Sequence, residues 1–156
     1  MISRDNSQHN KGLQDNPDFR AMTNKDITST VELISRAMNP DEGQQARETF
    51  QFHFSCAAAS IDDGRAYYVL DNRDSIYGIA GLHRYIWGPP ENVWLAWFAV
   101  APERHGAGLG KSLLSEAISI ARQRGHSRMF IETYSTQEFA RARTFFNAED
   151  PELRHR

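Results

Sequence analysis

The sequence predicts a single-domain α/β protein, an α+β mixed sheet flanked by helices, and three observations support this. Segments with strand and helix periodicity alternate along the 156 residues. Residues 93–100 are apolar at both odd and even positions, which is typical of a central strand buried on both faces. The strand–helix–strand pattern over residues 93–134 predicts two parallel strands joined by a right-handed crossover.

The N-terminal half begins with a short apolar strand at 19–23. A Thr-Asn pair can then cap a helix over 26–38, whose apolar side chains recur every three or four residues. Asn39-Pro40 ends this helix, because the residue before a proline disfavours helical backbone. A second helix is expected over 41–59, where aromatic and alanine side chains are spaced for one face.

Two strands of a hairpin follow at 66–70 and 76–86, joined by a polar turn. The doubly apolar strand comes next, after a Gly-Pro-Pro break. A helix is expected over 108–124, and the glycine that follows it is a typical helix stop. The last elements are a strand at 129–134 and a helix at 136–148 that starts with a Ser-x-x-Glu capping box.

Composition limits the classes of protein to consider. We expect one domain over 18–148, a flexible polar tail at 1–17 and a polar tail at 149–156. The formal net charge of -2 leaves no broad basic surface for nucleic acid. No apolar run reaches the ~20 residues of a membrane span, and the N-terminal tail lacks the apolar core of a signal peptide. The single cysteine fits a reducing compartment, so we expect a cytoplasmic protein.

A glycine-spaced loop lies between the strand 93–100 and the helix that follows it. Its glycines are Gly106, Gly108 and Gly110. Glycine lets the backbone approach a ligand closely, and the free N–H groups and positive dipole end of a helix N-terminus attract anions. The loop therefore predicts a site for a ligand that carries phosphate.

Three kinds of loop compete for this segment. A Walker phosphate loop would place its first glycine where His105 stands, so the match fails by one position. A dinucleotide fingerprint would need a third glycine where Lys111 stands. A plain strand-to-helix turn needs one glycine, whereas this loop has three.

The loop best resembles a different phosphate-binding motif. Residues Val100–Leu114, VAPERHGAGLGKSLL, resemble the motif Arg/Gln-x-x-Gly-x-Gly/Ala of the GNAT superfamily of acyl-coenzyme A N-acyltransferases, with His105 at the usual Arg/Gln position. The order of elements over 19–148 is similar to the family's order, and residues 132–146 look like one subgroup's fifth strand and fourth helix. The resemblance implies a GNAT-like fold, acetyl-coenzyme A as co-substrate and no metal.

The resemblance also implies where coenzyme A lies, in the gap between splayed fourth and fifth strands. Main-chain groups of Phe98, Ala99 and Val100 would pair with the pantetheine arm. A backbone N–H near Phe98 would polarise the thioester carbonyl. The diphosphate would lie against His105, Gly106, Ala107, Gly108, Leu109, Gly110, Lys111 and Ser112.

The implied reaction is direct attack by a primary amine of a small molecule or peptide on the acetyl carbon. No carboxylate occurs in 93–100, where many relatives carry a base, so Glu132 is the best candidate and His83 the second. Tyr134 would help to position the acceptor. Phe146 stands where relatives have the tyrosine that protonates the leaving thiolate, and it has no proton to give.

The C-terminus departs from the family pattern. Relatives continue into two more strands, whereas residues 149–156 are polar and lack strand periodicity, so we expect the last two strands to be absent. The strand 129–134 would then present an open edge, which favours a homo-oligomer through that edge and weak activity. The alternative function is a non-catalytic acyl-coenzyme A binding or interaction module.

Overall fold

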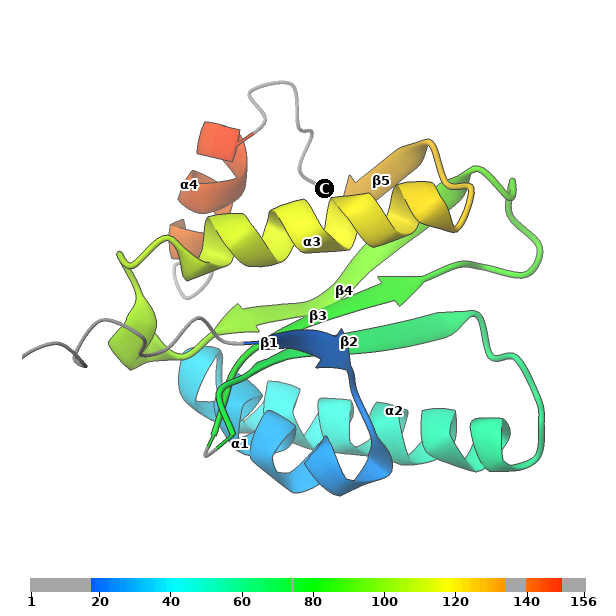
Figure 1. The fold of residues 1–156 in the computed structure, drawn as a ribbon, viewed down its shortest axis with the longest axis horizontal. Helices are drawn as coiled ribbons and strands as arrows, with labels where there is room; N and C mark the ends of the chain where they lie inside the picture. The colour runs from blue at the N-terminus through cyan, green and yellow to red at the C-terminus, as the bar shows by residue number, and fades with distance from the viewer. Residues whose placement is uncertain (1–17, 74, 134–139, 150–156) are drawn as a thin grey trace, which may run out of the picture.

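The computed structural model describes residues 18–73, 75–133 and 140–149, and in this part of the chain one sheet lies between two layers of helices (Figure 1). The sheet has five strands in the order β1-β2-β3-β4-β5. Neighbouring strands of the sheet are antiparallel, except β4 and β5, which are parallel. The predicted mixed sheet flanked by helices is confirmed.

The strands are β1 (Asp18–Ala21), β2 (Arg65–Asp71), β3 (Ile76–His83), β4 (Asn92–Val100) and β5 (Arg128–Ile131). The helices are α1 (Ile27–Ala37), α2 (Pro40–Ala58), α3 (Leu109–Gln123) and α4 (Ala140–Glu149), with 3-10 turns η1 (Asn24–Asp26) and η2 (Pro102–Arg104).

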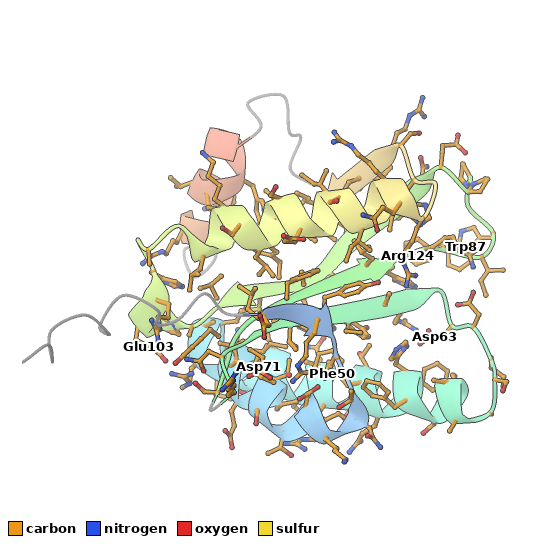
Figure 2. All side chains as sticks on the ribbon, viewed as in Figure 1. Phe50, Asp63, Asp71, Trp87, Glu103 and Arg124 are labelled. Atoms are coloured by element: carbon orange, nitrogen blue, oxygen red, sulfur yellow. The ribbon has the colours of Figure 1, made fainter. Side chains whose placement is uncertain are left out.

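Helices α1 and α2 cover one face of the sheet. They are separate helices because Asn39 caps the second one: its side chain accepts the Glu42 N–H at 2.8 Å, with Pro40 at the first helical position. Ile34 and Phe50 have no exposed surface and pack with Ile79 in the core on this side. Figure 2 shows the Phe50 side chain between α2 and the sheet.

Helices α3 and α4 lie on the other face (Figure 1). Leu113 and Ala117 of α3 are fully buried against β3 and β4, in a cluster that includes Ala80 and Val93. Ala99 of β4 belongs instead to the core on the α1 and α2 side. Strand β4 therefore packs against both helical layers, as its doubly apolar sequence predicts.

Two predicted strands are shorter than expected. The strand expected to reach residue 86 ends at His83, because its partner β2 begins at Arg65, the residue that pairs with His83. The strand expected over 129–134 is Arg128–Ile131, because its pairing with β4 ends at Ile131. Among the described residues β5 pairs only with β4, and association through its other edge stays a prediction.

Several expectations fall outside the described residues. These are the start of the last helix before 140, and nearly all of the two tails. Helix α4 is described from Ala140 and continues to Glu149, one residue past the expected end. No helix in the described ranges combines the length and the apolar character that crossing a membrane requires.

Candidate functional site

Strand β5 is paired along its whole length, but only with the first half of β4. Their pairing runs from Asn92 to Leu95 on β4 and goes no further. Just beyond this pairing the register of β3 and β4 shifts. Ile79 pairs with Ala99 and Gly81 pairs with Ala96, so β4 has one extra residue here, which is a β-bulge. Trp97 at this bulge has a φ of 49°, which is strained backbone for a large side chain. The bulge changes the course of β4 at the point where β5 ends, and this leaves a gap between the two strands.

The first cavity of the site has a volume of about 320 Å³ and lies where β4 runs into the glycine loop. Residues 98–100 of β4 and residues of α4 form two of its walls, and the loop and the first turn of α3 form another. Arg104, Lys111 and Arg141 bring three positive charges to its lining. Sequence reasoning missed Arg141, because its place depends on how α4 packs across the loop.

The loop has the backbone of an anion cradle. Gly106 and Gly108 have φ values of 83° and 79°, a region that other residues rarely adopt, and a Cβ added at either would meet no protein atom within 4 Å. The first bond inside α3 runs from the Ser112 N–H to the Gly108 carbonyl at 3.1 Å, so the three N–H groups before Ser112 have no helical partner. Open space beside unpaired donors at a helix N-terminus suits a diphosphate.

His105 lies in this cavity but is partly engaged by the protein itself. Its Nε2 lies 2.9 Å from the Val100 carbonyl, so this N–H ties the loop to the end of β4. The other ring nitrogen, Nδ1, is the one that is left for a ligand. A contact between His105 and phosphate stays a prediction.

A second cavity, of about 470 Å³, lies on the α2 side of the same gap. Glu42, Gln45 and Thr49 line it from one side of α2, at a spacing that puts them on one helix face. Most of the other lining residues come from β2, β3, β4, α4 and the segment around the end of β5. Both candidate bases, Glu132 and His83, are among them. The tertiary structure therefore brings together two residues that are far apart in the sequence.

The two candidate bases differ in position and environment. Burial lowers the pKa of the His83 imidazole from its ordinary value, and the charge of Arg65 adds to this, so the neutral form, which can accept a proton, is favoured. His83 pairs with Trp94, whereas Glu132 follows Ile131, which pairs with Leu95. Glu132 is thus closer in register to the bulge, and its side chain is exposed to the cavity. Tyr134 lies outside the described residues.

The two cavities meet at a shared wall. Met38, Phe98, Ala142 and Phe146 line both of them. The rings of Phe98 and Phe146 have centroids 5.4 Å apart, and Phe146 is only 4% exposed. A ligand that crosses from the first cavity to the second would pass the backbone of Phe98 and the ring of Phe146. Such a site can hold an anionic carrier on one side and a nucleophile on the other.

Comparisons with known proteins agree with this geometry. A protein described as an acetyltransferase of the GNAT family from Desulfovibrio desulfuricans has a TM-score of 0.74 and 25% identity, covering 85% of this chain and 82% of its own. The ribosomal-protein-S18-alanine N-acetyltransferase of Escherichia coli has a TM-score of 0.61 and 18% identity, covering 85% and 76%. PaiA N-acetyltransferase of Thermoplasma acidophilum, in complex with coenzyme A, has a TM-score of 0.66 and 14% identity, covering 85% and 87%.

None of the curated protein sequences compared with the chain matches it. The sequence profile of the acetyltransferase (GNAT) family matches residues 27–145, which is more than half of the chain. This range includes the glycine loop, β4 with its bulge, and the β3 wall of the second cavity. The chain therefore belongs to the acetyltransferase (GNAT) family.

Proposed function

We propose that this protein is an N-acetyltransferase that moves the acetyl group of acetyl-coenzyme A to a primary amine of a small molecule or peptide. The observation that carries the proposal is the meeting of two cavities at the β4 bulge. One cavity contains an anion cradle, and the other contains two groups able to accept a proton. Membership of the family supports acyl transfer in general, and the second cavity supports an amine acceptor.

In the proposed reaction the acceptor arrives as an ammonium ion and gives one proton to Glu132, with His83 as the second candidate base. The nitrogen lone pair then attacks the thioester carbon, forming a C–N bond. A backbone N–H near Phe98 stabilises the negative charge that develops on the carbonyl oxygen. The C–S bond breaks, the nitrogen loses its remaining extra proton to water, and the coenzyme thiolate leaves.

The test of this proposal is acetyl transfer by the purified chain. Acetyl-coenzyme A is supplied with butylamine, 1,4-diaminobutane, 2-phenylethylamine or a tetrapeptide with a free N-terminus. We expect thiol release that depends on the amine, together with an acetylated product detected by mass spectrometry. Tight binding of acetyl-coenzyme A without transfer to any of the four acceptors would favour the alternative, a non-catalytic acyl-coenzyme A binding module.

Phe146 allows a test of the missing acid. We expect Phe146→Tyr to raise the single-turnover transfer rate by about threefold or more, because a tyrosine hydroxyl at this wall can protonate the thiolate that now depends on water. The control is Phe145→Tyr, since Phe145 lines only the first cavity. Equal rates for wild type and Phe146→Tyr would mean that thiolate protonation does not limit transfer.

A further inference from the structure

Five side-chain rings form one cluster beside the second cavity. This ring cluster comes from the end of β3, the loop after it, β4 and β5, and its members are His83, Tyr85, Trp87, Trp94 and Phe130. The ring of Tyr85 is at the centre, with centroid distances of 4.3 Å to His83 and 4.7 Å to Trp87. Trp94 is 4.8 Å from Tyr85, and it stacks on Phe130 at 4.8 Å.

The ring cluster belongs to neither core of the described residues. Its side chains pack on one another, and none of them is part of the apolar groups that the helices form with the two faces of the sheet. Trp87, on the loop between β3 and β4 in Figure 2, is 82% exposed, and Phe130 is 37% exposed. The other three rings line the second cavity. Exposed apolar surface that continues into a cavity is typical of a binding site.

The second cavity has an inner end at the shared wall and an outer end at the ring cluster. On β4, Phe98 is part of the shared wall and Trp94 is part of the ring cluster, and four residues of strand span about 13 Å. On α2, Glu42 lies in the first turn, just after Met38 of the shared wall. Thr49 lines the same cavity seven residues further along, which is about 10 Å of helix.

The charged side chains of this cavity differ between its two ends. Glu42 is at the inner end, and Glu132 adds a second carboxylate. Arg65 pairs with His83 across β2 and β3, so it is at the outer end. Burial lowers the pKa of His83, and the charge of Arg65 lowers it further, although Asp63, 3.4 Å from Arg65, offsets part of this effect. An acceptor with an ammonium group at one end and an uncharged group at the other fits this arrangement.

The distance from the candidate base to the ring cluster suits a short arm. Trp94 pairs with Phe130, and Glu132 comes two residues after Phe130. Two residues of extended chain span about 7 Å and return the side chain to the same face of the sheet. A primary amine beside Glu132 can therefore reach the ring cluster through a short carbon chain that ends in an apolar group.

We propose that the ring cluster is the specificity subsite for the acceptor, and that it binds an aromatic ring carried by the amine. The preferred acceptor is then a small arylalkylamine. This rests on the proposed function, because the amine of the acceptor lies beside Glu132. The acceptor ring packs on Tyr85 and Trp94, which line the cavity, while Trp87 and Phe130 support these two rings from outside it.

The order of preference among the amines named above tests this subsite. We expect kcat/KM to be about tenfold higher for 2-phenylethylamine than for butylamine, since contacts with two aromatic rings contribute severalfold each. 1,4-Diaminobutane should be no better than butylamine, because its second ammonium group would lie toward Arg65. Equal values for 2-phenylethylamine and butylamine, or the highest value for 1,4-diaminobutane, would overturn the proposal.

Tyr85→Leu removes one ring of the subsite, and Phe52→Leu is its matched control. Phe52 is 57% exposed on α2 and lines neither cavity. We expect Tyr85→Leu to lower the ratio of kcat/KM for 2-phenylethylamine to kcat/KM for butylamine about fivefold, and Trp94→Leu to do the same. Phe52→Leu should keep the wild-type ratio. A general loss of structure lowers both values together, so a wild-type ratio in both subsite variants would overturn the proposal.

The two proposals can fail separately. If wild type transfers acetyl to none of the four amines, acetyl transfer to amines fails. The subsite is then judged by calorimetry with 2-phenylethylamine and with butylamine, each in the presence of coenzyme A. Tighter binding of 2-phenylethylamine by wild type, with a smaller difference in Tyr85→Leu, supports the subsite. Equal binding of the two amines, or binding of neither, overturns it.

Discussion

Replacing Gly108 by alanine is expected to weaken acetyl-coenzyme A binding by about tenfold or more, roughly 1.4 kcal/mol. Gly108 caps the N-terminus of α3 with a φ of 79°, and a Cβ added there points into space free of protein atoms within 4 Å. In the complex we expect phosphate oxygens to occupy that space. The added methyl group would therefore push the diphosphate away from the N–H groups that open α3.

Gly125 is a matched control for this experiment. It has a φ of 89° and, like Gly108, no protein atom within 4 Å of an added Cβ, but it lies after the opposite end of α3. Alanine at either position should cost about 1 kcal/mol of folding stability, because both backbones are left-handed. Calorimetry should find weaker binding for Gly108→Ala alone. Equal losses of affinity in both variants would show that backbone strain, rather than the cradle, controls binding.

Replacing Glu132 by glutamine is expected to lower turnover by ~10²-fold or more while acetyl-coenzyme A affinity stays the same. Glutamine keeps the shape of the side chain and cannot take the proton of the ammonium ion. Glu132 lines the second cavity and is absent from the lining of the first, so coenzyme binding should not depend on it. Steady-state kinetics with the best acceptor and calorimetry with acetyl-coenzyme A measure the two effects.

Two further variants interpret the result for Glu132. Glu116→Gln removes an exposed carboxylate of α3 that lines neither cavity, so it controls for the loss of one negative charge. His83→Gln removes the second candidate base, whose neutral form is favoured because burial lowers its pKa. If Glu132→Gln keeps the wild-type rate and His83→Gln loses it, the proton goes to His83 instead. Wild-type rates in both variants would rule out either side chain as the base.

Local chemistry made the conformation of the glycine loop predictable. Only glycine adopts the left-handed backbone of positions 106 and 108 without strain, so the spacing of the glycines already indicated the shape of the loop. The doubly apolar strand before it is confirmed as β4, which packs against both helical layers. Both signals depend only on residues that are close together in the sequence, so they can be recognised without knowing the fold.

The gap between β4 and β5 was predictable only through the family resemblance. Its cause is the bulge at Trp97 and the end of the β5 pairing at Ile131, and neither has a local signature in an apolar strand. The predicted strand over 129–134 is too long for the same reason. Pairing length is a property of two strands together, so one strand's sequence cannot determine it.

The acceptor side needed the tertiary structure almost entirely. The sequence by itself determined the fold class, the glycine loop and the residue types able to act as bases. Only the register of β2, β3, β4 and β5 decided that Glu132, His83 and Tyr67 line one cavity. Tyr67 and Tyr68 are alike in the sequence, and strand alternation puts them on opposite faces. The packing of α2 against the sheet, which connects residues far apart in the chain, decided which of those faces holds the cavity.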